Sequence, residues 1–380
     1  MKKLFGLLIA IVMVVALVGC RENTSKKLKV GLIGSAAGLN DKGYNQFAVD
    51  GLKKAEKEFD ITTKTVDITS GVDINKTLDQ FGQQKYDLVF LLEYNFDGLI
   101  TSYNNGKPIA EKYPNTQFVI FNAFANTNEQ GNKIHSNVTE VLFGVNESSY
   151  LAGMLAVLAY ENRDIFIDNT YLFPDNRALA FVGGTNSEGI TVFSYGFYQG
   201  ANAAAHEAGV TYDIYETYEA GFGASTEMAQ KIKGYYDNGV STVYGAAGGV
   251  ASNIRTEAET AKRFMVDVDA NQDELKPGYV LTSVLKKTDS AVYELIKELK
   301  NKTFEGGKVR NYNLANSGTD ITDLSTISRF IKEEKTAKWN EIKRKIRDAK
   351  TAIINGTIDV IDAQNHEVLD KTTLTNLNFR

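Results

Sequence analysis

The fold is decided by residues 28–59, whose sequence is LKVGLIGSAAGLNDKGYNQFAVDGLKKAEKEF. The apolar run 28–34 is typical of a buried parallel strand, and the pattern of residues 52–59 predicts a helix. Between them, residues 38–51 form a loop rich in carboxylate, aromatic, carboxamide and lysine side chains. Because open α/β sheets hold ligands at the carboxyl ends of their strands, this loop is predicted to form half of a small-molecule clamp.

Strand and helix patterns continue to alternate after this unit. In the first half we expect strands at 65–68, 88–92, 118–121 and 137–143, with helices near 74–84 and 95–112. In the second half we expect helices near 147–158, 192–208, 225–238, 251–262 and 288–299, and strands at 179–182, 212–218, 242–245, 263–268 and 279–284. Regular alternation predicts an α/β fold, with parallel, right-handed sheets covered by helices on both faces.

Two doubly wound lobes in tandem account for this pattern most economically. We expect the first lobe to comprise residues 28–141 and about 286–310, and the second to comprise residues 142–285 and about 311–380. No linker rich in Pro, Gly or Ser separates them, so the chain should cross near 138–145 and return near 284–288. A helix near the C-terminus is predicted by the spacing of Trp339, Ile342, Ile346, Ala349 and Ile353, with a C-cap at Asn355-Gly356.

The first nineteen residues have the features of an export signal. Two lysines precede sixteen uncharged residues, 4–19, a run shorter than the ~20 residues of a membrane-spanning helix. The sequence Leu17-Val18-Gly19-Cys20 resembles a bacterial lipobox, so we expect cleavage before Cys20, lipidation of its sulfur, and a polar tether over 20–27. The alternative is an uncleaved N-terminal anchor. Both interpretations place the remaining chain on the extracytoplasmic face of the cell membrane.

The amino-acid composition excludes several classes of function. Cys20 is the only cysteine, which excludes a disulfide framework and a thiol catalyst in the exported part. The formal charge changes from −5 to −7 when the two signal lysines are removed, and this acidic balance argues against nucleic acid as a partner. His135, His206 and His366 lack the spacing of metal ligands, so neither a metal nor a cofactor is expected.

Catalytic signatures are absent from the sequence. It contains no G-x-S-x-G elbow, Walker A motif, H-E-x-x-H motif or Cys-His pair, and the glycines at 31, 34 and 38 have the wrong spacing for a dinucleotide fingerprint. Polar and aromatic groups instead gather at the predicted carboxyl ends of strands in both halves. This pattern favours binding without turnover, and no enzymatic activity is expected.

Eight blocks of sequence stand out, namely Asn40–Gln46, Tyr86–Val89, Phe143–Leu155, Phe181–Gly184, Tyr195–Phe197, Ala246–Gly249, Val266–Asp269 and Leu281–Lys286. In this order they resemble motifs of the basic membrane protein (Bmp) family, the purine-nucleoside receptor lipoproteins that feed ABC transporters. The resemblance implies the type I periplasmic binding protein fold, in which two Rossmann-like lobes joined by a three-stranded hinge close on a ligand. It also implies a permease and an ATPase subunit as partners.

Carried over position by position, the resemblance implies ligand-binding residues in the first lobe. Asp41 would accept from the hydroxyls of a vicinal diol such as that of ribose, with a helix cap as the alternative role, and Asn45 would bind a base edge. Tyr44, where the family usually has Phe, would stack on one face of the base. Asn122 stands where the family usually has an aspartate that accepts from base N–H groups, which leaves the base preference open.

The second lobe supplies the opposite half of the site in this resemblance. Phe193 would be the second stacking ring, with an ordinary core phenylalanine as the alternative. Asp267 and Lys286 would hold the ribose, and Gly248 or its neighbour would offer a backbone contact. Asp269 could replace Asp267; strand alternation puts both on one side of the chain, and a turn suits Asp269 better.

We therefore expect a lipid-anchored, monomeric solute-binding protein that captures a purine nucleoside by hinge closure and delivers it to an ABC importer. One alternative is a receptor for a sugar or a small signalling molecule. Two others are a nucleoside-processing enzyme and a ligand-sensing regulator. The regulator is disfavoured because no helix-turn-helix segment precedes Leu28.

Overall fold

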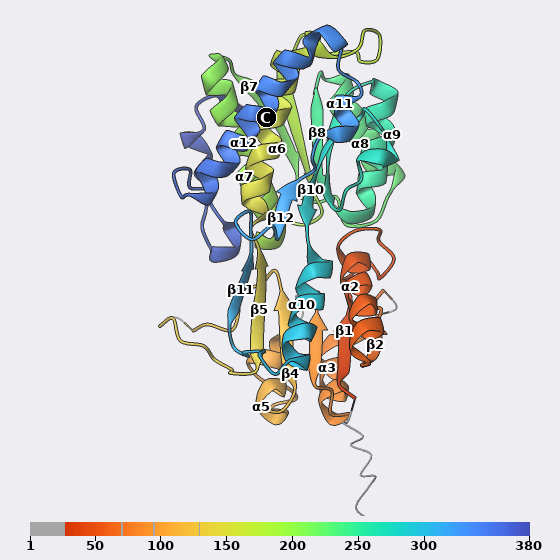
Figure 1. The fold of residues 1–380 in the computed structure, drawn as a ribbon, viewed down its shortest axis with the longest axis vertical. Coiled ribbons are helices and arrows are strands. Elements are labelled where there is room, and N and C mark those ends of the chain that lie inside the picture. Colours follow the sequence, from red (N-terminus) through yellow and green to blue (C-terminus); the bar gives the residue numbers. More distant parts are fainter. Residues whose placement is uncertain (1–26, 70, 94–95, 129) are drawn as a thin grey trace, which may run out of the picture.

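The computed structural model describes residues 27–69, 71–93, 96–128 and 130–380, which form two lobes, each built on one sheet (Figure 1). The expected signal, Cys20 and all but the last residue of the tether lie outside the described residues. Among the residues described, no helix combines the length and apolar character needed to span a membrane.

The sheet of the first lobe has the strand order β11-β5-β4-β3-β1-β2, and its strands pair in parallel. The strands are β1 (Lys29–Ile33), β2 (Thr62–Val66), β3 (Leu88–Leu91), β4 (Gln117–Phe121), β5 (Val138–Phe143) and β11 (Val309–Tyr312). The helices of this lobe are α2 (Tyr44–Phe59), α3 (Ile74–Gln83), α4 (Asp97–Ile100), α5 (Ile109–Lys112) and α10 (Thr288–Lys300). Continuous apolar runs fill β3 and most of β4, as strands buried on both faces require.

The sheet of the second lobe has the order β12-β10-β9-β8-β6-β7-β13, and only β12 runs antiparallel to its neighbour. The strands are β6 (Ala178–Gly183), β7 (Tyr212–Thr217), β8 (Thr242–Ala246), β9 (Phe264–Asp269), β10 (Val280–Lys286), β12 (Thr319–Ile321) and β13 (Leu377–Phe379). The helices are α6 (Val145–Glu161), α7 (Glu188–Ala208), α8 (Thr226–Asp237), α9 (Ala251–Ala261), α11 (Ser325–Ser328) and α12 (Thr336–Ile354). Short 3-10 turns are η1 (Arg163–Ile165), η2 (Gly248–Val250), η3 (Asp273–Leu275), η4 (Glu333–Lys335), η5 (Ala363–Asn365) and η6 (Lys371–Thr373).

Some sequence-based boundaries were wrong. Helix α2 begins at Tyr44, so the second half of the expected loop 38–51 is helical. The expected helix 95–112 is instead two short helices, α4 and α5, because Asn104 and Asn105 turn the chain between them with φ of 51° and 59°. The short strands β11, β12 and β13 were not predicted.

The chain passes between the two sheets at three places that lie side by side. The crossings are Gly144, between β5 and α6, Lys287, between β10 and α10, and the segment from β11 to β12. The Gly144 N–H donates to the Tyr312 carbonyl over 2.9 Å, and the Lys287 N–H donates to the Gly318 carbonyl over 3.1 Å. These backbone bonds tie the crossings to one another and give the lobes a common hinge.

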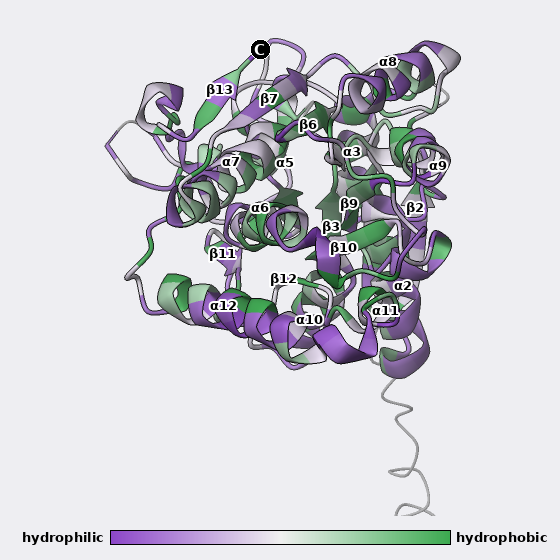
Figure 2. Cartoon of the chain, turned by 90° about the horizontal axis from the view of Figure 1, so that it is seen from above, coloured by the Kyte–Doolittle hydropathy of each residue, from purple (hydrophilic) through white to green (hydrophobic). Residues whose placement is uncertain are grey.

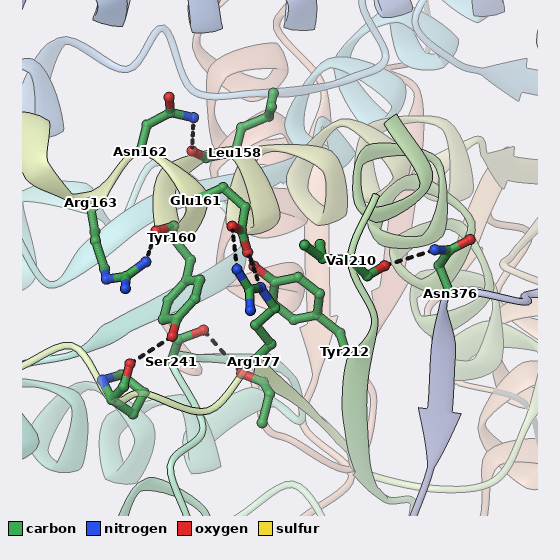
Figure 3. Close-up of polar contacts among 12 residues, drawn as sticks. Leu158, Tyr160, Glu161, Asn162, Arg163, Arg177, Val210, Tyr212, Ser241 and Asn376 are labelled. Atoms are coloured by element: carbon green, nitrogen blue, oxygen red, sulfur yellow. Dashed lines mark hydrogen bonds and ion pairs between the residues drawn. The ribbon is translucent and has the colours of Figure 1, made fainter. Parts of the chain in front are cut away.

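Helices α6 and α7 pack backbone to backbone in the second lobe. A Cβ atom added at Gly200 would lie 1.9 Å from the Tyr150 carbonyl oxygen, and one at Gly153 would lie 2.1 Å from the Phe197 carbonyl oxygen. Only glycine therefore fits at these contacts. The far end of α6 is fixed by polar contacts, since Glu161 accepts from Arg177 and, over 2.7 Å, from the Tyr212 hydroxyl (Figure 3).

Helix α12 has the buried apolar face predicted from its spacing. Trp339, Ile342, Ile346, Ala349 and Ile353 are all buried, and Gly356 follows the helix with φ of 71°. The Trp339 ring lies 6.5 Å from that of Phe166, and its Nε1–H donates to Ser328 Oγ over 2.7 Å. Figure 2 shows α12 at the periphery of the molecule with mainly hydrophilic residues, as expected for a solvated outer face.

Candidate ligand-binding site

A cavity of about 670 Å³ lies between the two lobes. Its walls come from the carboxyl ends of strands in both sheets, where doubly wound folds hold ligands. The first lobe contributes Ser35, Ala36, Ala37, Asp41, Tyr44, Ile68, Glu93 and Asn122, and the second contributes Thr185, Ser187, Gly189, Ile190, Phe193, Phe222, Ala246, Ala247, Gly248, Val268 and Asp269. Lys286, at the crossing from β10 to α10, completes the lining. The volume is in the range of roughly 300–1,000 Å³ that is common for small-molecule sites.

Most of the residues expected from the sequence meet at this cavity. Those that line it are Asp41, Tyr44, Asn122, Phe193, Gly248 and Lys286. Asn45 and Asp267 do not line it, and each is engaged in contacts within its own lobe.

Asp41 caps the start of α2. Its Oδ1 accepts from the backbone N–H groups of Gly43 and Gln46, each over 3.0 Å, and its Oδ2 accepts from both the backbone and the side chain of Asn45 over 3.1 and 2.9 Å. A carboxylate offers about four acceptor sites, so these four bonds use its capacity. The alternative role of helix cap is therefore the one that the contacts of Asp41 support.

Asn45 holds the loop before α2 to the end of β1. It is fully buried, its Oδ1 accepts from the Ser35 N–H over 2.7 Å, and its Nδ2 donates to Ser35 Oγ over 2.8 Å. Since these bonds and the one to Asp41 occupy its amide, Asn45 supports the cavity wall from behind.

Asp269, rather than Asp267, faces the cavity from the end of β9. Asp267 is 1 % exposed, pairs with Arg255, and accepts from the Val268 N–H over 2.9 Å. Asp269 has φ of 70°, a left-handed conformation that breaks the strand alternation on which the choice of Asp267 depended. The carboxylate that lines the cavity is therefore Asp269, whereas Asp267 was the one expected there.

Lys286 is a buried cation beside Asp269. Its Nζ lies 5.0, 5.3 and 5.4 Å from the ring centroids of Tyr44, Phe143 and Phe193, within reach of cation–π attraction. Burial lowers the pKa of Lys286 to about 8, against the opposing influence of Asp269. Burial likewise raises the pKa of Asp269 to about 6, although the Lys286 ammonium favours the ionised form. At neutral pH Asp269 is therefore ionised and Lys286 is charged, so the two opposite charges attract each other within the cavity wall.

Two aromatic side chains face the cavity from opposite lobes. Tyr44 begins α2, and its ring has Lys286 over it, whereas Phe193 lies in the second turn of α7 and is 3 % exposed. The Phe193 ring also contacts Tyr244 edge-on, with centroids 6.4 Å apart. Phe193 is thus both a wall of the cavity and part of the core of the second lobe.

Gly248 and Phe222 close one side of the cavity in the second lobe. Gly248 has φ of 52°, and a Cβ there would lie 3.3 Å from the Phe222 carbonyl oxygen, so a side chain would be both strained and crowded. Phe222 was not predicted. Its signal in the sequence is an aromatic residue between two glycines, Gly221 and Gly223, in the loop between β7 and α8.

The lobes touch beside the cavity. The Gln272 side chain donates to the Lys42 carbonyl over 2.8 Å, and Asp269 accepts from the Tyr44 N–H. A Cβ at Gly43 would lie 2.9 Å from the Asp269 carboxylate, which shows how closely the two loops approach. The residues after β9 therefore meet the loop 38–43 of the first lobe directly.

Comparison with known proteins gives the family. A family model described as "Bmp: ABC transporter substrate-binding protein PnrA-like" matches residues 27–363. The chain is 29 % identical to the ABC transporter nucleoside-binding protein BmpA of Lactococcus lactis, over 93 % of this chain and 96 % of that protein. It is 26 % identical to an uncharacterized lipoprotein of Pyrococcus abyssi, over 83 % of this chain and 74 % of that protein.

The fold has counterparts among solved structures. An ABC transporter solute-binding protein from Aeropyrum pernix K1 superposes with a TM-score of 0.73 at 21 % identity, over 92 % of this chain and 95 % of that chain. The expected type I periplasmic binding protein fold is thereby confirmed. The family model and the Lactococcus relative are described as binding proteins of ABC transporters rather than as enzymes, in agreement with the prediction from the lack of catalytic signatures. This chain belongs to the Bmp family of PnrA-like ABC transporter substrate-binding proteins.

Proposed function

We propose that this protein is the lipid-anchored, extracytoplasmic receptor of an ABC importer and that its ligand is a purine nucleoside. The observation that carries the proposal is a cavity between the lobes that combines an aromatic ring from each lobe with the partly buried Asp269 carboxylate and the buried Lys286 ammonium. The rings of Tyr44 and Phe193 suit a flat base, and Asp269 with Lys286 suits neighbouring hydroxyl groups. The name of the Lactococcus relative, a nucleoside-binding protein, supports the same ligand class.

The polar pair accounts for recognition of the sugar. The Asp269 carboxylate can accept from hydroxyl donors, and the Lys286 ammonium can donate to hydroxyl oxygens, so a vicinal diol would satisfy both groups at once. The apolar part of the wall offers Asp269 and Lys286 no hydrogen-bond partners. The hydroxyl groups of a bound ligand would supply them. Nucleosides are therefore expected to bind more tightly than free bases, which lack the diol.

Closure of the lobes over the ligand would give the importer a shape to recognise. The three crossings at Gly144, at Lys287 and between β11 and β12 are the natural hinge, and Gln272 and Lys42 lie at the opposing edges that meet. The permease and ATPase subunits are the proposed partners, and the receptor is proposed to act as a monomer. Lipidation at Cys20 would hold it at the membrane, in keeping with the lipoprotein name of the Pyrococcus relative.

The proposal is tested by calorimetry on the chain from residue 21 onward. Adenosine, inosine and guanosine are titrated alongside adenine, ribose and uridine. We expect purine nucleosides to bind at least tenfold more tightly than adenine or ribose alone, because only they engage both the rings and the charged pair.

Two results would overturn the assignment. Ribose or another sugar binding as tightly as adenosine would indicate a sugar receptor. Equal affinity for adenosine and adenine would show that the diol of the sugar contributes nothing to binding. Mass spectrometry of small molecules released from the protein as purified from its native membrane provides an independent check of the ligand class.

A further inference from the structure

The first lobe has one end that faces away from the cavity. Its six strands all pair in parallel, so their carboxyl ends meet at the cavity and their amino ends meet at the opposite end of the lobe. We call this opposite end the basal end, and Figure 1 shows it at the bottom, beside α3 and α5. It is made of the segments that lead into the six strands, namely 27–29, 57–62, 83–88, 111–117, 131–138 and 300–309.

The basal end is positively charged although the protein is acidic. It contains five carboxylates, Glu58, Asp60, Asp87, Glu111 and Glu305, and nine lysines, Lys27, Lys29, Lys57, Lys85, Lys112, Lys133, Lys300, Lys302 and Lys308. Its formal charge is therefore +4. Since the exported chain as a whole carries −7, the rest of that chain carries −11. Positive charge is thus concentrated at one end of the molecule.

Most of these lysines are available to an external partner. Eight of the nine are exposed, and Lys29 is half-buried. Three form ion pairs, Lys27 with Asp60, Lys112 with Asp79 and Lys308 with Glu305. Among the residues that the structure describes, the other five exposed lysines form no ion pair, and these are Lys57, Lys85, Lys133, Lys300 and Lys302. The positive charge of the basal end is therefore not neutralised within the protein.

The proposed lipid anchor joins the protein at this same end. Lys27 lies there because β1 begins at Lys29, and Cys20 precedes Lys27 by seven residues. An extended chain covers at most about 3.6 Å per residue, so a lipid on Cys20 would lie within about 25 Å of the basal end. An anionic bilayer strengthens the association of a protein by about fivefold for each lysine held near its surface. The anchor thus brings the positive end of the molecule to a surface that attracts it.

We propose that the basal end is a contact surface for anionic phospholipid headgroups, which holds the anchored receptor upright with its second lobe outermost. The inference rests on the lipid anchor of the proposed function and is independent of the ligand. In this orientation the cavity lies beyond the first lobe, away from the bilayer, where solutes can reach it. Because the attraction is electrostatic, salt weakens it, and the receptor can leave the lipid surface to dock on its importer.

Lysine acetylation on anchored protein tests the orientation. The chain from Cys20 onward is coupled through its single thiol to a maleimide lipid, in vesicles of phosphatidylcholine alone or with about one third phosphatidylglycerol. A water-soluble active ester acetylates accessible amines, and mass spectrometry measures the rate at each lysine. We expect Lys57, Lys85 and Lys302 to react at least about fivefold more slowly on the anionic vesicles than on the neutral ones. The difference should vanish at about 1 M salt, where charges are screened beyond about 3 Å.

Lysines of the second lobe supply the internal control. Lys231, Lys233 and Lys338 are exposed on α8 and α12, and their rates should be the same on both kinds of vesicle.

Charge reversal tests whether the lysines cause the contact. The test variant combines Lys57→Glu, Lys85→Glu and Lys302→Glu, and the control variant combines Lys231→Glu, Lys233→Glu and Lys338→Glu. Both change the net charge by the same amount. In the test variant Lys133 and Lys300 should lose their protection on anionic vesicles, whereas in the control variant they should keep it. Thermal unfolding confirms that each variant is folded, and the comparison of lipids and salt decides the question without any variant.

The outcomes separate this inference from the proposed function. Equal rates at the basal lysines on neutral and anionic vesicles, or equal protection of both lobes, overturn the inference; the former result would leave the basal end to an acidic protein or polymer. Neither result affects nucleoside binding, which calorimetry measures on the chain from residue 21. Protein purified from its native membrane without lipid on Cys20 would overturn the inference together with the anchoring part of the proposed function.

Discussion

Asp269 and Lys286 give the site a defined dependence on pH. Asp269 has its pKa raised to about 6 by burial, so below that pH it becomes protonated and accepts hydrogen bonds poorly. Lys286 has its pKa lowered to about 8 by burial, so above that pH it loses its charge and one donor. The charged pair exists between these two values. We predict that adenosine affinity, measured by calorimetry from pH 5 to pH 9, is highest between about pH 6 and about pH 8.

A variant shows which group causes the loss of adenosine affinity at each end of the pH range. Lys286→Met keeps most of the length of the side chain but has no proton to lose, so the weakening above about pH 8 should disappear. The weakening at acidic pH should remain and move to higher pH, because the pKa of Asp269 rises when the ammonium is lost. Affinity that is constant across the whole range in the unsubstituted chain would contradict the role of the pair.

Phe193 should contribute through stacking more than through packing. Phe193→Leu keeps an apolar side chain of similar volume, so the cost in stability should be below about 1.5 kcal/mol, whereas loss of base stacking should cost about 1–3 kcal/mol of binding. Calorimetry with adenosine and urea unfolding measure the two effects. The control is Phe197→Leu, one turn further along α7, which is buried against Tyr244 and does not line the cavity. Equal losses of affinity in both variants would argue against stacking.

At the residue scale, the sequence predicted where the site lies better than what each residue does. Tyr44, Phe193 and Lys286 were indicated by the resemblance to the Bmp family, and all three line the cavity, where parallel topology brings the ends of strands together. Asp267 was expected to face the cavity because strand alternation was assumed to continue to the end of β9. The left-handed backbone at Asp269 breaks that alternation. Asn45 was misjudged because its partner, Ser35, lies ten residues away across a loop, a contact that no local pattern encodes.

At the element scale, the contact of α6 with α7 should tolerate no side chain at its glycines. Gly200→Ala would place a Cβ atom 1.9 Å from the Tyr150 carbonyl oxygen, so the helices must separate. Overpacking of this kind costs about 1–3 kcal/mol, and we predict a loss of unfolding free energy of at least that size in urea.

Gly234 is the matched control for this substitution. It also lies inside a helix, α8, but a Cβ there meets nothing within 4 Å. Gly234→Ala should therefore raise the unfolding free energy by about 0.5–1 kcal/mol, because alanine loses less conformational freedom on folding than glycine. Similar effects of the two substitutions would show that the helix contact is looser than the structure indicates.

Elements with strong apolar patterns were predictable, and those that depend on distant partners were not. Strand β3 and most of β4 are short apolar runs with buried faces, and α12 has a regular apolar face, so the local sequence predicts each of them. Strands β11 and β13 are short, and each pairs in parallel with a strand more than 150 residues away in the sequence. Their extended conformation is imposed by those partners, which explains why the sequence pattern did not reveal them.

At the scale of the whole molecule, the contact between Gln272 and Lys42 should stabilise the closed form. Gln272→Ala removes a hydrogen bond between the lobes, whose net value is typically about 0.5–1.5 kcal/mol. We predict that adenosine affinity falls by about 2- to 13-fold, mainly through faster dissociation measured by stopped flow, with the melting temperature of the ligand-free protein unchanged.

The matched control for that prediction is Gln199→Ala. The Gln199 side chain donates to the Tyr195 carbonyl within α7, so its bond does not join the lobes. An equal effect of the two substitutions on dissociation would mean that Gln272 does not act through closure.

The position of Trp339 decides how closure can be observed by spectroscopy. It is the only tryptophan in the chain, it packs among Phe166 and other residues of the second lobe, and it does not line the cavity. Its emission therefore reports the integrity of that lobe and should barely change when a ligand binds. The chain also has a single cysteine, Cys20, so a form that begins at residue 21 has none. One cysteine introduced at a chosen edge of the cleft can then be labelled with a single dye that reports closure. The Trp339 indole serves as the internal fluorescence standard in the same sample.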